Sequence, residues 1–376
     1  MNKNTKLLKY IFKNHFHSFW KSNKYKFPKI THDSIWNNVN RFLDCGDIAH
    51  GYTAFKCEKY THTHITSFSC KSRFCPSCGK IYAENWALNI KDQLINTTHI
   101  HATFSFPKGF VRYFFFNHRH KLKNLAHAAY EALQYSFRKL GVLSFGAIIN
   151  IHTFGRDTNW NPHIHCIFTL GGFDKSSNWK NINSLSYTLL RKSWQRCSLK
   201  IIQNFANKTK NTNLNNKISL CYHEYKDGFY VNANQKINNF FEICKYIGRY
   251  LARPAISEYR ILKITESHVT FWYQNPDSKD KISLTLTINQ FIGRLLSHIP
   301  LKNFKMIRRF GLYARRTKNK MPKKNKLFKA NLSWAERIFK TFGTNPLICP
   351  NCGSTLILLE IYHSKYGVIF PKNGFS

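Results

Sequence analysis

Three stretches of the chain carry apolar residues three and four positions apart, the spacing that places them on one face of a helix. These stretches are residues 1–44, 120–140 and 238–251. Pro254 follows the third stretch, and because proline cannot continue a helix, the pattern predicts that this helix ends before it. Residues 1–44 are also basic, so we expect a basic helical lead-in there.

Runs of β-branched and aromatic residues predict strands between these helices. They occupy residues 97–107, 143–151 and 162–170, and the last run stops at Gly171-Gly172. Because strands and helices alternate in this part of the chain, we expect a sheet with helices packed on one face.

The second half of the chain contains a predicted hairpin and two polar stretches. Residues 269–273 and 282–286 form two short strands joined through Asn275-Pro276-Asp277, a combination typical of a turn. Residues 201–217 are rich in Asn and Lys and predict an exposed insertion. Residues 318–326 predict a solvated basic linker.

The composition indicates a folded, strongly basic protein. Of 376 residues, 58 are Lys or Arg and 18 are Asp or Glu, which gives a formal net charge of +40, while 43% are hydrophobic. Such a charge favours a polyanionic partner, and the aromatic content of 16% favours one with stackable bases, so we expect nucleic acid. There is no run of about 18 apolar residues. We therefore expect a cytoplasmic protein without membrane contact.

The cysteines cluster two and four residues apart, which favours metal binding over disulfides. Four thiolates have spacings able to surround one tetrahedral Zn²⁺: Cys57, Cys70, Cys75 and Cys78. Gly79 follows the last of them, and a glycine relieves backbone strain in the knuckle turn that such a run forms. We predict a structural zinc ion here.

Other residues remain candidates for metal binding. Cys45, His62 and His64 are spare ligands near the first cluster. A second half-knuckle, Cys349-Pro-Asn-Cys352-Gly353, has no obvious second pair. It either binds a metal weakly, shares zinc with another segment or forms a plain turn.

Five His-x-His pairs occur, where chance predicts about one at this histidine content. Residues i and i+2 of a strand point to one face, so His163 and His165 would present two imidazoles together. His99 and His101 could do the same. The residue before a proline favours an extended backbone, so Asn161-Pro162 supports a strand at His163 and His165. This context supports these two histidines as ligands of a metal.

Two tyrosines, Tyr246 and Tyr250, lie four residues apart on the predicted helix and hence on one face. Aromatic packing is the alternative interpretation, but Lys245, Arg249 and Arg253 make this segment cationic. A tyrosine hydroxyl has a pKa of about 10 and is a poor nucleophile. It can attack a scissile phosphate polarised by a divalent ion, with departure of the 3′-hydroxyl and formation of a 5′-phosphotyrosine.

Three motifs occur in order: Cys70-Lys-Ser-Arg-Phe-Cys75-Pro-Ser-Cys78, Asn161-Pro-His163-Ile-His165, and Lys245-Tyr246-Ile-Gly-Arg-Tyr250. In this combination the chain resembles the IS91-type transposases, a group of the HUH single-strand endonucleases. Runs beginning at Phe291 and Phe304 are also similar, so the resemblance spans about residues 40–355.

The resemblance implies an α+β fold. We expect an HUH endonuclease domain with a central antiparallel sheet and flanking helices, a small N-terminal zinc-binding module and a basic C-terminal extension. The expected segments are a basic helical lead-in (1–44), the zinc-binding module (45–95), the catalytic domain with the tyrosine helix (96–260), a DNA-binding extension (261–317), and a basic linker and tail with Cys-x2-Cys (318–376).

The implied function is a DNA transposase that nicks and rejoins single-stranded DNA at element ends through a 5′-phosphotyrosine in rolling-circle transposition. Its partners would be single-stranded DNA at the element termini and target DNA, with nucleoid association when bound. His163 and His165 would hold a catalytic Mg²⁺ or Mn²⁺, and Tyr246 and Tyr250 would be the nucleophiles. The residues expected to contact DNA are Lys245, Arg249, Arg253, Arg308 and Arg309.

Two ligand assignments stay open at this point. The third ligand of the catalytic metal is Glu242, His101 or His152. The family usually has a second cysteine where this chain has Tyr60, so the fourth zinc ligand is Cys70, His62 or His64.

Two other functions remain alternatives. A non-catalytic, zinc-dependent nucleic-acid-binding protein would show salt-sensitive binding without strand cleavage. A rolling-circle replication initiator or relaxase would share the chemistry but act at a replication or transfer origin.

Overall fold

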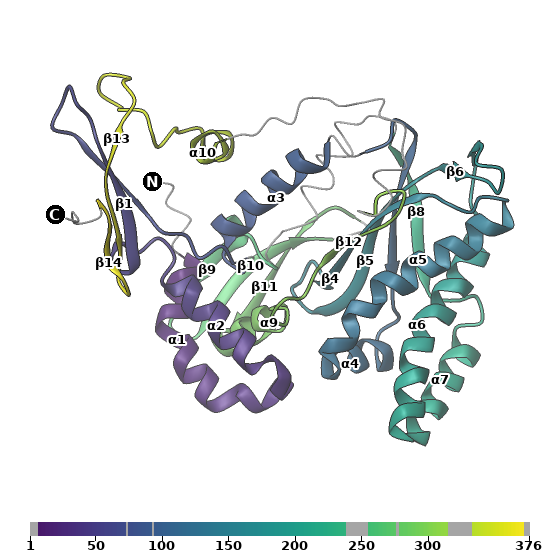
Figure 1. The fold of residues 1–376 in the computed structure, drawn as a ribbon. Helices are drawn as coiled ribbons and strands as arrows, with labels where there is room; N and C mark the ends of the chain where they lie inside the picture. Colours follow the sequence, from purple (N-terminus) through teal and green to yellow (C-terminus); the bar gives the residue numbers. More distant parts are fainter. Residues whose placement is uncertain are drawn as a thin grey trace.

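A computed structural model describes residues 7–72, 74–91, 94–237, 255–275, 278–314 and 333–371. Its centre is a five-stranded sheet in the order β12-β4-β5-β3-β8, in which every neighbouring pair is antiparallel (Figure 1). The strands are β3 (His99–Ser105), β4 (Gly146–Phe154), β5 (Trp160–Thr169), β8 (Tyr230–Ile237) and β12 (Ile307–Gly311). A hairpin of β6 (Gly171–Phe173) and β7 (Trp179–Asn181) follows β5.

Helices cover one face of this sheet, as Figure 1 shows. They are α4 (Phe110–Asn117), α5 (Leu122–Lys139), α6 (Tyr187–Thr209) and α7 (Thr212–Glu224). The largest apolar core lies between them and the sheet, with Phe104, Phe137 and Trp194 fully buried. The expected α+β class with a central antiparallel sheet is confirmed, and a further helix containing Trp86 and Ile90 packs on the opposite face.

The prediction of an exposed insertion at residues 201–217 is wrong. This stretch forms the end of α6 and the start of α7. Ile202 and Ala206 are buried on one face of α6, and the Asn211 side chain accepts a hydrogen bond from the N–H of Leu214 at the start of α7. The asparagine that indicated a loop is therefore a helix cap.

A second core joins the beginning of the chain to residues 255–299. It is built from α1 (Leu7–Asn23), α2 (His32–Leu43), β9 (Ile261–Ile264), β10 (His268–Gln274), β11 (Lys281–Thr287) and α9 (Ile288–Leu296). β10 and β11 pair in antiparallel fashion, which confirms the predicted hairpin strands, although Pro276 and Asp277 of the predicted turn lie outside the described residues.

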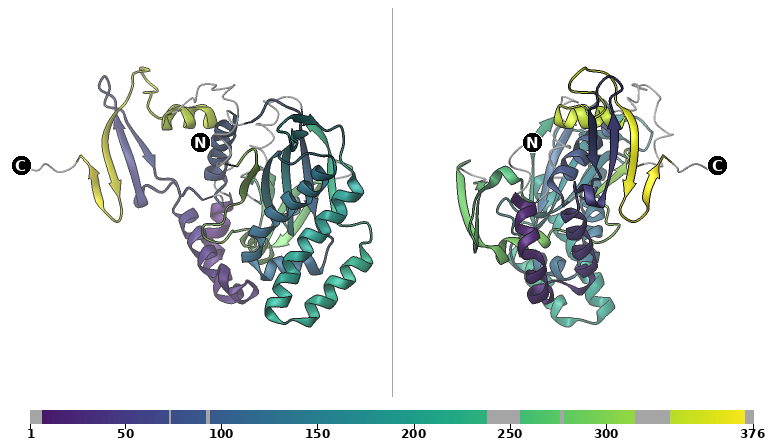
Figure 2. Two further views of the ribbon diagram at one scale, coloured as in Figure 1. Left: turned by 45° about the vertical axis from the view of Figure 1, so that its right-hand side comes forward. Right: turned by 90° about the vertical axis from the view of Figure 1, so that its left-hand side faces the viewer.

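A small sheet in the order β14-β13-β1-β2 brings residues 51–67 together with residues 357–370, near the C-terminus (Figure 2). β1 (Gly51–Lys56) pairs with both β2 (Thr63–Ser67) and β13 (Ile357–His363), and β14 (Gly367–Phe370) lies at the edge. The chain connects this sheet to the rest through α3 (Pro76–Lys91) and α10 (Trp334–Phe342), which contact each other. Strands from the segment expected to be the zinc-binding module (45–95) and from the expected tail (318–376) thus share one sheet.

Short 3₁₀ turns complete the described elements: η1 (Lys24–Lys26), η2 (Lys29–Thr31), η3 (Ile48–His50), η4 (Arg119–Lys121) and η5 (Glu258–Arg260). The predicted helix at 238–251 and the predicted linker at 318–326 lie outside the described residues. Within the described ranges, the helices lack the combination of length and apolar character needed to cross a membrane.

The end of β12 depends on a glycine. Gly311 has a φ of +56°, and a Cβ added there would lie 1.8 Å from the carbonyl oxygen of Phe145. Because that oxygen belongs to the backbone and cannot move aside cheaply, we expect Gly311→Ala to lower the free energy of unfolding by more than about 2 kcal/mol, measured by urea denaturation.

Gly141→Ala is the matched control. Gly141 also has a positive φ, +77°, but a Cβ there would meet only the Lys180 ammonium at 3.3 Å, at the flexible end of a side chain. The free energy of unfolding of this variant should fall by only about 1 kcal/mol, which is the backbone strain of an alanine at positive φ. Equal losses for the two variants would contradict the steric explanation.

Candidate functional site

The pleat of β5 separates core residues from polar ones. Ile164, Cys166 and Phe168 are fully buried in the core beneath the helices. His163 and His165 alternate with them and therefore project from the opposite face of the sheet. This is the arrangement that the His-x-His spacing predicted.

β4 adds a third imidazole to this face. His152 on β4 lies directly opposite His163 on β5 in the antiparallel register. The Nε2 atoms of His163 and His165 are 3.1 Å apart, and one ring nitrogen from each of the three histidines lies within 4.8 Å of the others. Nitrogens this close, on two adjacent strands, could share one metal ion.

Neighbouring polar groups orient the rings. Nδ1 of His163 lies 2.7 Å from the carbonyl oxygen of Asn161, to which it donates when protonated. That tautomer leaves the Nε2 lone pair of His163 directed at the cluster. Nδ1 of His165 lies 3.1 Å from Nε2 of His101, and Nε2 of His152 lies 2.6 Å from the Asn150 amide nitrogen.

Burial keeps His101, His163 and His165 neutral. It lowers the pKa of His163 and of His101 to about 4, and it holds the pKa of His165 well below its usual value, with further lowering by His152 and His163. A neutral imidazole has the free lone pair that coordination of a metal requires. The site thus fits a divalent cation by its donor set and by the charge state of its donors.

Among the three candidates for the third ligand, His152 joins the cluster. His101 instead lies behind His165, where it contacts the outer nitrogen of that ring. Glu242 lies outside the described residues, as do other predicted site residues: Lys245, Tyr246, Arg249, Tyr250 and Arg253.

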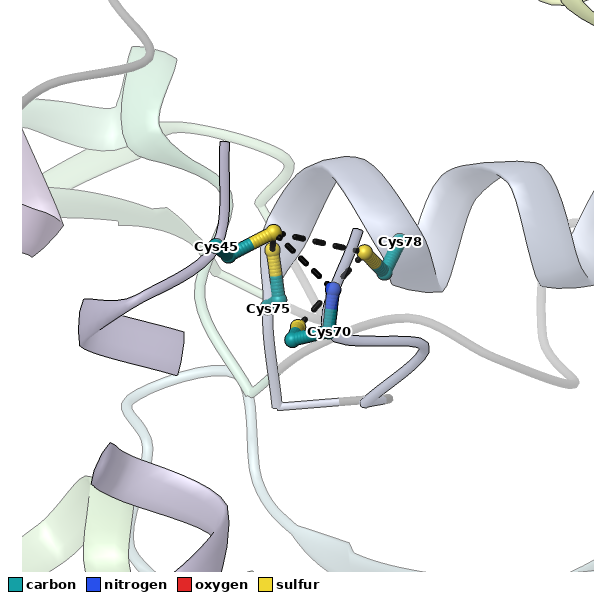
Figure 3. A group of neighbouring side chains, drawn as sticks. All are labelled: Cys45, Cys70, Cys75 and Cys78. Carbon is teal, nitrogen blue, oxygen red and sulfur yellow. Dashed lines mark hydrogen bonds between the residues drawn. The ribbon is translucent and has the colours of Figure 1, made fainter. Parts of the chain in front are cut away.

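Four cysteines form a second candidate metal site (Figure 3). Their sulfur atoms lie within 4.8 Å of one another, with contacts of 3.7 Å between Cys45 and Cys78, 3.6 Å between Cys70 and Cys78, and 3.8 Å between Cys45 and Cys75. Cys78 lies in the first turn of α3, and Cys75 directly precedes that helix. The other two come from loops after α2 and β2.

The structure corrects one member of the predicted zinc set. Cys57 is not part of this cluster, and Cys45, a spare candidate by sequence, takes its place beside Cys70. The reason is strand pairing: the N–H of Gly46 donates to the carbonyl of Phe68 at 3.0 Å, which brings the residues before β1 next to those after β2. Cys57, at the far end of β1, lies beside Cys349 and Cys352 instead.

Backbone N–H groups donate to two sulfur atoms of the four-cysteine cluster, and contacts between its sulfur atoms lower the pKa of Cys45 and Cys78 but raise the pKa of Cys70 and Cys75. The N–H of Cys70 donates to the sulfur of Cys45 at 3.3 Å, and the N–H of Ser72 donates to the sulfur of Cys70 at 3.4 Å. Contacts from Cys70 and then Cys75 lower the pKa of Cys45 to about 7. Four sulfur donors at this spacing fit a closed, structural Zn²⁺ site.

A basic groove runs along the edge strand β12. It has a volume of about 480 Å³, and its lining includes Lys305, Arg308 and Arg309 together with the aromatic residues Tyr82 and Trp86 of α3. The Arg309 guanidinium lies 5.5 Å from the centre of the Trp86 ring. Nε of Arg308 is buried and has no hydrogen-bond partner among the described residues. Cationic and aromatic side chains together suit a single-stranded nucleic acid.

Two family models match the chain. Residues 11–106 match a model described as "Transposase zinc-binding domain", and residues 146–321 match one described as "Putative transposase". The first range contains the four-cysteine cluster, and the second contains His152, His163 and His165. The chain belongs to the IS91-type transposases and carries their N-terminal zinc-binding domain.

Relatives among curated proteins agree with this assignment. The chain is 28% identical over 339 residues to the "Transposase for insertion sequence element IS801" of Pseudomonas savastanoi pv. phaseolicola, covering 85% of this chain and 82% of the relative. It is 25% identical over 289 residues to the "Putative transposase y4qJ" of Sinorhizobium fredii, covering 72% of each. No solved structure matches the chain. A transposase is an enzyme that cleaves and rejoins DNA, so DNA is the partner.

Replacing Cys45 tests the corrected cysteine set. We expect Cys45→Ser to lower the zinc content of the purified protein by one ion per chain, as Cys75→Ser does, because a hydroxyl is a poor replacement for a zinc-bound thiolate. Metal analysis by plasma mass spectrometry measures this content. Cys221→Ala, at a buried cysteine under the helices, is the control and should retain the ion. If Cys45→Ser kept its full zinc content, Cys45 would not be a ligand, and another residue would have to be the fourth ligand.

Proposed function

We propose that this transposase nicks and rejoins single-stranded DNA at its element ends through a 5′-phosphotyrosine intermediate, as in rolling-circle transposition. The observation that carries the proposal is the cluster of His152, His163 and His165 on one face of an antiparallel sheet. Family membership provides the DNA substrate, and the histidine cluster provides a site for the divalent ion that cleavage by a phenol needs.

His163 and His165, with His152 as third ligand, would hold Mg²⁺ or Mn²⁺. When bound, the ion supplies Lewis-acid polarisation of the scissile phosphate. The chain's own residues set the geometry: the Asn161 carbonyl fixes the tautomer of His163, and His101 orients the ring of His165 from behind. We assign His101 the role of a positioning residue.

Tyr246 and Tyr250 are the proposed nucleophiles. The phenol oxygen bonds to phosphorus, the bond from phosphorus to the 3′ oxygen breaks, and the leaving 3′ oxygen takes up a proton as the phenol gives one to solvent. The DNA then carries its 5′ phosphate on tyrosine. Attack by a 3′-hydroxyl on this ester rejoins the strand and releases the phenol. A second tyrosine allows a second strand to be held at the same time.

The connection from β8 lets this segment reach the histidines. Ile237, the last residue of β8, is paired with His99 and is buried on the histidine face, whereas His165 is paired with Thr103. The two register rows are four residues apart on β3, or about 13 Å. β8 also lies two strand spacings, or about 10 Å, from β5. Nine residues lead from Ile237 to Tyr246, and a chain of nine residues spans from about 14 Å as a helix to about 30 Å when extended.

The groove along β12 is the proposed path of the DNA strand. Arg309 pairs with Ile148 on β4, four residues before His152, so both side chains lie on the same face of the sheet. Arg308 and Lys305 add positive charge to the groove, and Trp86 offers a ring for base stacking. A strand lying here would lead toward the histidine cluster.

The tyrosines are tested by trapping the covalent adduct. Incubation with a labelled single-stranded element end and Mg²⁺ or Mn²⁺ should give a protein–DNA adduct that Tyr246→Phe plus Tyr250→Phe reduces at least about a hundredfold, because no phenol oxygen remains to attack. Tyr246→Phe and Tyr250→Phe, tested separately, show which tyrosine forms the adduct. Tyr222→Phe, at an exposed tyrosine of α7, is the control and should form the adduct normally. An unchanged adduct in the double variant would refute the proposal.

The histidines are tested by separating cleavage from binding. We expect His163→Ala and His152→Ala to lower nicking at least about a hundredfold while DNA binding at a fixed salt concentration is retained. His101→Ala should retain nicking but need about 10- to 100-fold more metal for half-maximal rate, because it acts through His165. His268→Ala, at the exposed first residue of β10, is the control. Joint loss of binding and nicking in His163→Ala would indicate a structural role.

A further inference from the structure

A second group of cysteines lies apart from the four-cysteine cluster, at the small sheet. Cys57 directly follows β1, and Cys349 and Cys352 lie in the segment between α10 and β13. Their sulfur atoms lie within 4.8 Å of one another, with 3.5 Å between Cys57 and Cys352. The matches to the two family models include Cys57 but end before residue 349, so neither covers Cys349 or Cys352.

The turn at Cys349 shares one hydrogen bond with the first cluster, although Gly79 is helical there and Gly353 has a φ of +70°. In Cys75-Pro-Ser-Cys78-Gly79, the N–H of the glycine donates to the carbonyl of the first cysteine at 2.8 Å. In Cys349-Pro-Asn-Cys352-Gly353, the equivalent bond is 2.9 Å. Both turns direct two sulfur atoms to the same side. Each Cys-Pro-x-Cys-Gly segment thus supplies a pair of possible zinc ligands.

Polar groups donate hydrogen bonds to two of these sulfur atoms, while burial raises the pKa of the Cys57 thiol. The backbone N–H groups of Tyr60 and Lys59 donate to the sulfur of Cys57, and the hydroxyl and N–H of Ser354 donate to the sulfur of Cys352. Amide donors converging on sulfur stabilise its negative charge, as they do in the first cluster. Three thiolates in contact repel one another unless a cation lies between them.

His62 is the candidate for a fourth ligand, and its ring would have to turn toward the sulfur atoms, because only the three cysteines have their ligand atoms within 4.8 Å of one another. The N–H of Cys57 donates to the carbonyl of His62 at 3.0 Å, so the turn between β1 and β2 holds the two residues together. Nε2 of His62 is buried and has no hydrogen-bond partner within the described part of the chain. A buried nitrogen without a partner is costly unless something coordinates it.

We propose that Cys57, Cys349 and Cys352, together with His62, bind a second structural Zn²⁺. Three sulfur donors and one imidazole are a common tetrahedral zinc set. The ion would join residues 57 and 352, which are 295 positions apart, and so fasten the C-terminal strands β13 and β14 to β1.

The apolar core beside this sheet is small, so a bound ion would stabilise the sheet. Its buried residues besides the cysteines are Phe55 and Leu356, while Leu358 and Leu359 of β13 are exposed. A core of this size contributes little to the free energy of folding, and small sheets of this kind need a metal or disulfide. The zinc ion supplies that cross-link between the ends of the chain.

The test is the zinc stoichiometry of the full chain, purified in reducing buffer without added metal. We expect two zinc ions per wild-type chain and one in each of Cys349→Ser, Cys352→Ser and Cys75→Ser, with two retained in Cys221→Ala. One zinc ion in the wild type, or a disulfide between Cys57 and Cys352, overturns the proposal. Because the wild-type count needs no variant, misfolding cannot obscure the result.

Cobalt substitution tests the fourth ligand. In the Cys75→Ser background Co²⁺ bound at the second cysteine group should show the thiolate-to-cobalt absorption of a tetrahedral complex, which Co²⁺ at the histidine cluster lacks because that cluster has no sulfur donor. His62→Ala should shift or abolish that absorption, whereas His64→Ala, two residues along β2, should leave it unchanged. An unshifted spectrum in His62→Ala overturns the assignment of His62. These measurements do not depend on nicking, so they stand or fall separately from the proposed function.

Discussion

The alternation of side chains along β5 is the constraint on which the histidine site depends. One strand supplies both the centre of the largest core, through residues such as Ile164 and Phe168, and two metal-binding candidates on its opposite face. The antiparallel register with β4 then places His152 opposite His163. Because burying the wrong face of β5 would remove its apolar residues from the core, the energy of folding also fixes the positions of the imidazoles.

The two cysteine clusters lie in different apolar cores: the first in the second core, and the other in the small core beside β1. Cys70, Cys75 and Cys78 belong to the second core, where Phe12 and Phe42 pack with Phe74. This cluster connects the first helices to α3, and α3 lies against the histidine face of the central sheet through Ile90 and Trp86. Metal binding, helix packing and the position of the basic groove are therefore physically connected, since Trp86 also lines that groove.

Local patterns predicted much of the fold. The helix at 120–140, the strands around β3, β4 and β5, and the hairpin of β10 and β11 follow from periodicity over a few residues, and the structure confirms them. The same reasoning failed at 201–217 because asparagine and lysine dominate the composition there. The few apolar residues nevertheless recur on one face, and burial of that face stabilises the helices.

Local sequence patterns likewise predicted one part of the candidate site and not the other. The sequence by itself determined that His163 and His165 share a face and that Cys75 and Cys78 form one turn, because both follow from the geometry of neighbouring residues. Only the tertiary structure decided that Cys45 replaces Cys57 and that His152 completes the histidine cluster. Those contacts depend on which strands pair and in which register. That choice minimises the free energy of the whole chain, and spacing along the sequence carries no record of it.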